Sequence, residues 1–202
     1  YVMGDVVYTV SHAHYCGNMG GGHPQYSAWK FQHAQAWSDT VTGDILNDVH
    51  GYPNWHGVKQ GPAMIDWTPE MAMGSYTGQY QAGWALTGND DYVVYGGEFP
   101  RVNGSGQQGL VRFGKRPVAP GRQGPIAPTG SMTPQIVAVS NTSARITWPA
   151  AYDRDTRNLT YTLYRGSTVI NTQTADSTWW QLPALGYVDS TVTPGTTYTY
   201  RV

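Results

Sequence analysis

Charged residues are scarce in this 202-residue chain, at 12% of the sequence, against about 25% in an average soluble domain. The formal net charge is −1 and no basic stripe runs through either half. The chain therefore lacks the lysine and arginine clusters that neutralise nucleic-acid phosphates. Long apolar runs are also missing, which argues against insertion into a membrane. We expect neither a nucleic-acid partner nor a membrane-spanning segment.

Cysteine is nearly absent as well. Because Cys16 is alone, an internal disulfide is excluded, but the compartment stays open, since large β-rich domains can be secreted without disulfides. Turn-forming and aromatic residues are abundant, with 25 Gly, 13 Pro, 15 Tyr and 8 Trp. Aromatic residues favour pleated strands, and tight turns need glycine and proline. This composition predicts an all-β fold.

The clearest change in composition lies at residues 115–130, KRPVAPGRQGPIAPTG. Prolines recur through this stretch, remove backbone donors and stiffen the chain, and few of its side chains suit a core. We interpret residues 115–127 as a linker between two domains, 1–114 and 128–202.

The C-terminal domain is predicted to be a β-sandwich. Short alternating runs are separated by turn signals, as in sandwich folds. In the second run, Ala144, Ile146 and Trp148 share one face. The predicted strands lie at Ile136 to Val139, Ala144 to Trp148, Leu159 to Arg165, around Trp179 to Leu182, and Thr197 to Val202.

The strand of Trp148, the hairpin LTYTLYRG and the ending VTPGTTYTYRV together resemble a fibronectin type III domain. The resemblance implies an immunoglobulin-like sandwich in which Trp148 is a core residue and Tyr198 is the residue of the tyrosine corner. The family's seventh strand would follow Val202. We therefore expect the sandwich to lack its last strand here and the intact protein to continue.

The N-terminal domain contains a predicted meander. Residues 92–113, YVVYGGEFPRVNGSGQQGLVRF, carry an Asn103-Gly104 hairpin signal between apolar runs. Upstream, a strand is predicted at Gln81 to Thr87 and a turn at Gly88 to Asp90. A three-stranded antiparallel sheet is expected.

A weaker copy of this pattern occurs near the start, where Asp5 to His12 aligns with Tyr92 to Phe99. Recurrence of one meander suggests a propeller. VVYGGEFPRVNG followed by GLVRF resembles the delta-60 type of β-propeller repeat, found in large secreted bacterial proteins that often carry fibronectin type III modules.

Two blades do not close a ring, so the remaining blades, like the last sandwich strand, are expected from missing chain or other chains. Residues 12–80 depart from the repeat and are interpreted as a long irregular insertion. Alternatively, residues 1–114 form an irregular all-β domain of another kind.

A metal site is one hypothesis for the N-terminal domain. If the first strand extends to Cys16, then His12, His14 and Cys16 share one face, and imidazole and thiolate ligands at this spacing suit Zn or Cu. The alternative is packing, because His12 aligns with the aromatic Phe99 and a small cysteine suits a core. In the C-terminal domain, the carboxylates of Asp153-Arg154-Asp155 suit weak Ca²⁺ binding or simply cap their loop.

Exposed aromatic residues are the other binding candidates, because flat rings stack on sugars and anchor protein interfaces. Adjacent tryptophans in an extended strand point to opposite faces, so one of Trp179 and Trp180 should be buried. The alternative for all of these rings is core packing. The predicted binding residues are Tyr52, Trp55, Trp67, Tyr76, Trp179 and Trp180.

Two functions fit these patterns, and no residue is predicted to be catalytic. The first is a non-catalytic segment of a secreted or cell-surface bacterial protein, with a propeller for recognition or adhesion and the fibronectin-like module as a spacer. Its partner would be a glycan or a protein at a cell surface or matrix. The second is an accessory part of an extracellular carbohydrate-active or metal-dependent enzyme.

Overall fold

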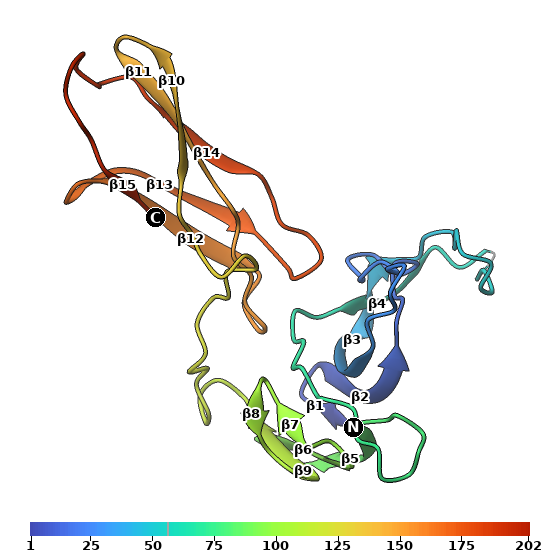
Figure 1. The fold of residues 1–202 in the computed structure, drawn as a ribbon. Coiled ribbons are helices and arrows are strands. Elements are labelled where there is room, and N and C mark those ends of the chain that lie inside the picture. The colour runs from blue at the N-terminus through green and yellow to red at the C-terminus, as the bar shows by residue number, and fades with distance from the viewer. Residues whose placement is uncertain (56) are drawn as a thin grey trace. The chain divides into compact units, whose positions relative to one another are not determined.

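The computed structural model describes residues 1–55 and 57–202, so His56 lies outside the described residues. Two compact units are present, unit 1 at Tyr1–Arg122 and unit 2 at Gln123–Val202, and their boundary falls within the predicted linker, residues 115–127. The described residues form no helix, and their strands pair in small antiparallel sheets (Figure 1). The predicted all-β class is confirmed.

Unit 1 begins with a four-stranded sheet of order β1-β2-β3-β4. Its strands are β1 (Val2–Met3), β2 (Val6–Ala13), β3 (Gln32–Asp44) and β4 (Gln60–Met64). The last two lie inside residues 12–80, so the prediction of one long irregular insertion there is wrong. Residues 33–36 of β3 are buried consecutively, which removes the alternation by which a half-buried strand is identified in a sequence.

The second sheet of unit 1 has the order β5-β6-β9 and confirms the predicted meander. It consists of β5 (Gly83–Gly88), β6 (Tyr92–Gly97) and β9 (Leu110–Gly114). Between the last two strands lies the hairpin of β7 (Arg101–Val102) and β8 (Ser105–Gly106). Its central residues, Asn103 and Gly104, have φ angles of 51° and 78°, as the predicted Asn-Gly turn requires.

Aromatic packing joins the two sheets of unit 1. The Oη of Tyr95, on β6, donates a hydrogen bond to the carbonyl oxygen of Thr9, on β2, at 3.2 Å. The Trp67 ring meets the rings of Tyr8 and Phe113 edge to face, at centroid distances of 4.9 and 5.2 Å. Trp67 therefore packs against the core, which corrects its prediction as an exposed binding residue.

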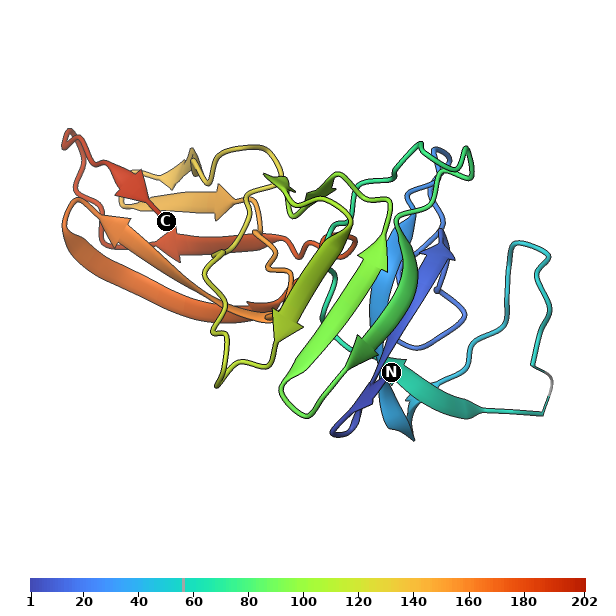
Figure 2. The same ribbon diagram turned by 90° about the horizontal axis from the view of Figure 1, so that it is seen from below.

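Unit 2 contains two three-stranded sheets, of order β10-β11-β14 and β13-β12-β15 (Figure 2). The first consists of β10 (Gln135–Ser140), β11 (Ser143–Trp148) and β14 (Leu185–Asp189). The second consists of β13 (Thr168–Asp176), β12 (Asn158–Arg165) and β15 (Tyr200–Arg201).

One apolar core takes side chains from both sheets of unit 2. Ile146 and Trp148 come from β11, whereas Tyr161 and Leu163 come from β12, and all four are buried. The Tyr161 hydroxyl also accepts a hydrogen bond from the Ala151 N–H and donates one to the Ala151 carbonyl oxygen, both at 3.1 Å. Trp148 is therefore a core residue of unit 2.

The run at Trp179 to Leu182 differs from its predicted extended form. Thr178 and Gln181 pair across a tight turn, and the intervening Trp179 and Trp180 are both half-buried. Their rings meet at 78° with centroids 5.2 Å apart. Because a turn does not alternate its side chains as a strand does, neither tryptophan has the fully buried position expected for one of them.

Candidate functional site: a patch of aromatic and histidine rings

Among the described residues, an extensive group of contacting rings outside the cores lies in unit 1, along β2 and the segment that leads into β3. A second part comes from the loop after β3. We call this group the ring patch. Its members are His12, His14, Tyr15, Trp29, Phe31, His33, His50 and Tyr52.

Strand pairing brings the first part of the ring patch together. Ala13 of β2 lies opposite Gln32 of β3, so alternate residues on the two antiparallel segments face one another. The His14 and Trp29 rings stack at a centroid distance of 4.0 Å and an interplanar angle of 5°. His12 and Phe31 also meet at 4.0 Å, tilted by 38°.

The loop after β3 contributes the second part. The Tyr52 ring lies 5.7 Å from Tyr15 and 5.9 Å from His14, centroid to centroid. Asp48 holds this loop, because its Oδ2 accepts hydrogen bonds from the backbone N–H groups of His50 at 3.1 Å and Tyr52 at 2.5 Å. Burial and the negative charge of Asp48 both raise the pKa of Tyr15.

A buried polar network accompanies the ring patch. The Nε2 of Gln35 donates to the Sγ of Cys16 at 3.1 Å and lies 3.3 Å from the Nε2 of His23. Burial raises the pKa of Cys16, although the Gln35 hydrogen bond opposes this. Burial lowers the pKa of His23. Both groups are therefore neutral near pH 7, which makes Cys16 a packing thiol rather than a reactive thiolate.

The predicted Zn or Cu site is not assembled. Strand β2 ends at Ala13, with a register irregularity after Val10, so the extended strand to Cys16 that the prediction required is absent. The Nδ1 of His12 lies 3.1 Å from the Oε1 of Gln81, His14 stacks on Trp29, and Cys16 is buried. Over residues 1–55 and 57–202, no three His, Cys, Asp or Glu side chains are grouped to hold a metal ion.

The suggested Ca²⁺ loop has the arrangement of a capped loop. The Oδ1 of Asp153 accepts a hydrogen bond from the backbone N–H of Asp155 at 3.0 Å. Burial raises the pKa of Asp153, and a side chain in this position closes its own loop. No third acidic side chain joins them among the described residues.

The remaining predicted binding residues lie at different places. Trp55 and Tyr76 are 63% and 96% exposed in unit 1, and Trp179 and Trp180 lie in a turn of unit 2. The sequence prediction missed Trp29 and Phe31. Trp29, Phe31 and His33 follow one another at intervals of two residues, as His12 and His14 do, and this shared alternation is the signal that could have paired the two segments.

Acidification is expected to destabilise unit 1. Burial lowers the pKa values of His23 and His33, so the unfolded chain binds protons at a higher pH than the folded chain. Stability should therefore be fully present above the unfolded histidine pKa of about 6.5 and fall as the pH drops below it. Urea unfolding of unit 1 at about pH 7.5 and about pH 5.5 measures this change. Unit 2, which contains no histidine, is the internal control, and an unchanged or rising stability of unit 1 would contradict the expectation.

Comparison with known proteins identifies no family for this chain. No family model, curated protein or solved structure matches it. Within the part of the chain that the structure describes, no helix is long and apolar enough to cross a bilayer. The ring patch is therefore interpreted from its own geometry.

Proposed function

We propose that the chain is a non-catalytic recognition segment that binds a glycan through the ring patch of unit 1. The observation that carries this proposal is the parallel stack of His14 and Trp29, in which the Trp29 side remains 55% exposed. One face of the indole is supported by the imidazole, so the ring is held in place before a ligand arrives. Preorganised aromatic surface binds at a lower entropic cost than mobile side chains.

The chemistry around these rings favours a sugar. Sugars combine apolar C–H faces with hydroxyl groups, and aromatic side chains with a few polar neighbours suit both. His12 and Gln81 supply an imidazole and an amide at one edge of the patch, and both can exchange hydrogen bonds with hydroxyls. Phe31 adds apolar surface beside them. Lys30 directly precedes Phe31 in the chain, but its Nζ is placed 4.9 Å from the centroid of the Tyr26 ring, which is not a member of the patch. The patch itself contains no lysine or arginine, which favours a neutral glycan over a polyanionic one.

For the folds of the two units, we propose propeller-like blades in unit 1 and a fibronectin type III-like sandwich in unit 2. Two sheets with antiparallel neighbours in chain order support the first assignment. In unit 2, two three-stranded sheets share one core. The Tyr198 hydroxyl also accepts a hydrogen bond from the Thr193 N–H at 3.2 Å, as expected of a tyrosine-corner residue.

In this proposal the chain belongs to a secreted multidomain bacterial protein, in which unit 2 is a spacer that presents unit 1 to a cell surface or matrix. Low charge and abundant turns, together with the two-unit organisation, support the proposal. A spacer needs a stable fold rather than a reactive site, and unit 2 has a continuous apolar core.

Replacing Trp29 by alanine is expected to weaken glycan binding about tenfold or more, because the main stacking surface is lost. A glycan array screened with the intact chain identifies the ligand, and calorimetry compares the variants. Trp84→Ala is the matched control, because Trp84 is an equally exposed tryptophan on β5, at 52%. If no glycan binds above background, or if both variants bind equally well, the ring patch is not a sugar site.

A further inference from the structure

Strand β10 of unit 2 is an exposed apolar edge. It is the terminal strand of the sheet β10-β11-β14, and each of its six residues is exposed. Ile136, Val137 and Val139 are 49%, 62% and 54% exposed, so apolar side chains reach solvent on both faces. The strand QIVAVS contains no charged residue and no proline.

An edge of this kind is suited to pair with another strand. Half of the backbone N–H and C=O groups of an edge strand point away from its only neighbour and lack strand partners. Proteins commonly protect such edges with lysine, proline, a β-bulge or a covering segment. Strand β10 contains neither lysine nor proline, and its register irregularity lies at its end, between Ala138 and Ser140. Peptide recognition by strand addition uses such an edge for affinity and an adjoining pocket for specificity.

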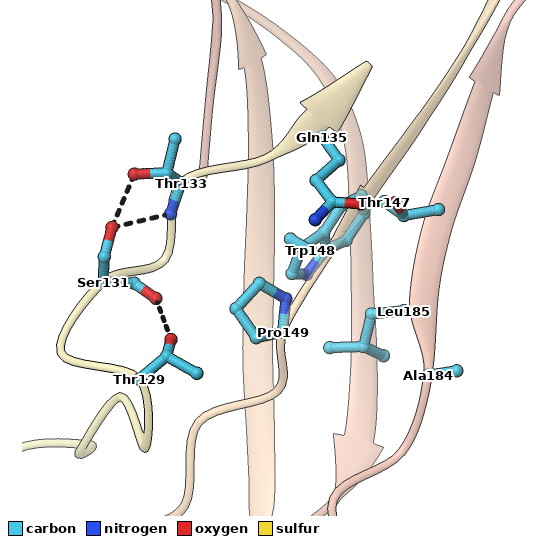
Figure 3. Close-up of a pocket in the computed structure, with 9 residues that line it drawn as sticks. All are labelled: Thr129, Ser131, Thr133, Gln135, Thr147, Trp148, Pro149, Ala184 and Leu185. Atoms are coloured by element: carbon cyan, nitrogen blue, oxygen red, sulfur yellow. Dashed lines mark hydrogen bonds between the residues drawn. The ribbon is translucent and has the colours of Figure 1, made fainter. Parts of the chain in front are cut away.

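A pocket of about 640 Å³ adjoins the start of β10. Figure 3 shows Trp148 and Pro149 between two sides of the pocket. One side carries Thr129, Ser131 and Thr133, and the other carries Thr147, Ala184 and Leu185. None of its lining residues is charged. They are Thr129, Ser131, Thr133, Gln135, Thr147, Trp148, Pro149, Ala184 and Leu185.

Trp148, which lines the pocket, has a buried hydrogen-bond donor that is not used within the described part of the chain. Trp148 is only 4% exposed, and its Nε1 has no hydrogen-bond partner among the described residues. A buried indole N–H normally finds an acceptor, because leaving it unpaired costs free energy. Three hydroxyls of the pocket already take part in hydrogen bonds within the chain: the Oγ of Ser131 and the Oγ1 of Thr133 lie 2.5 Å apart, and the Thr129 Oγ1 donates to the Ser131 carbonyl oxygen at 2.9 Å.

We propose that β10 and this pocket bind an extended, uncharged peptide segment of a partner protein. The segment adds to the sheet as a fourth strand beside β10, with β-branched side chains against Val137 and Val139. One of its carbonyl or hydroxyl oxygens accepts the hydrogen bond of the Trp148 Nε1–H. Neither the strand nor the pocket supplies a charged partner, so a charge on the peptide would lose hydration without compensation. Arg145 on β11 pairs with Val137 and is therefore one strand further from the added peptide. This site is separate from the ring patch of unit 1 and does not depend on glycan binding.

A blocked hexapeptide of alternating valine and threonine, acetylated and amidated, is the probe. Its control is the same peptide methylated on every backbone nitrogen, which removes the donors that strand pairing needs. Titration of the ¹⁵N-labelled intact chain, followed by NMR, should shift the β10 amide signals and the Trp148 indole signal with the first peptide and not with the second. Equal shifts with both peptides, or β10 shifts without an indole shift, overturn the proposal.

Val137→Lys tests the edge directly. A charge on β10 should weaken peptide binding about tenfold, because a desolvated ammonium opposes strand addition. Val169→Lys on β13 is the matched control, since Val169 is also a half-exposed valine on a terminal strand, at 50%. This variant should bind the peptide as tightly as the wild type does. Equal loss in both variants would overturn the proposal. Sedimentation of the chain without peptide measures its oligomeric state. A dimer that is abolished by Val137→Lys would mean that a second copy of the chain, and not a partner peptide, binds at β10.

Discussion

Tyr95→Ala is expected to destabilise unit 1 by about 3–5 kcal/mol, the range for removing a large buried aromatic side chain. Tyr95 is fully buried, and its ring contacts those of Trp67 and Phe113 at centroid distances of 6.0 and 5.8 Å. Its loss would leave a cavity in the core that joins the two sheets of unit 1. Because typical domains are stable by only about 5–15 kcal/mol, this change alone brings unit 1 close to unfolding.

Tyr95→Phe separates packing from hydrogen bonding at the same position. It keeps the ring and removes only the donor to the Thr9 carbonyl oxygen, so we expect a loss of about 1 kcal/mol. Urea unfolding, followed by NMR signals from each unit, measures both variants, with unit 2 unchanged as the reference. Equal losses for the two variants would mean that the hydrogen bond, and not the packed ring, holds the sheets together.

Asp189→Ala is expected to destabilise unit 2 by about 3 kcal/mol, because it removes a buried carboxylate that accepts several hydrogen bonds and pairs with the partly buried Arg165. The Asp189 Oδ2 accepts hydrogen bonds from the Nη1 of Arg165 and the Oη of Tyr200, both at 2.9 Å. The Asp189 Oδ1 accepts two more from Thr191, at 2.9 and 2.7 Å. Since Asp189 lies on β14 and its partners Arg165 and Tyr200 lie on β12 and β15, the network joins the two sheets.

The control for Asp189 is Asp176→Ala. Asp176 is exposed on β13 and accepts a single hydrogen bond from the Asn158 side chain, so its loss should cost about 0.5 kcal/mol or less. Urea unfolding near pH 7 compares the two variants. If both lose the same stability, the buried network contributes no more than a surface contact.

Acid should reduce the difference between Asp189→Ala and the wild type. Burial alone raises the pKa of Asp189, but the hydrogen bonds from Thr191 and Tyr200 and the charge of Arg165 outweigh it, so this pKa is lowered. The stabilisation is therefore present above the unfolded aspartate pKa of about 3.9 and is lost as the pH falls through the folded value. Burial, followed by the hydrogen bond and negative charge of Asp189, raises the pKa of Tyr200 to about 12, although Arg165 opposes this.

The sequence alone was sufficient where structure follows from local rules. The Asn103-Gly104 turn formed because both residues tolerate positive φ, and the strands near Ala144 to Trp148 and Leu159 to Arg165 formed where alternation was clear. Composition alone gave the all-β class. In each of these cases, the information lies within a few neighbouring residues.

Tertiary structure decided the features that depend on contacts between distant segments. Strand β3 could not be predicted from the sequence pattern, because His33 to Ala36 are buried in succession. Its pairing with β2 brings Trp29 into contact with His14. The aligned positions His12 and Phe99 also diverged, since His12 is exposed and Phe99 is fully buried. A repeat in the sequence does not say which face a neighbouring sheet will cover. Burial and ring stacking depend on how two sheets pack against each other, so only the tertiary structure determines them.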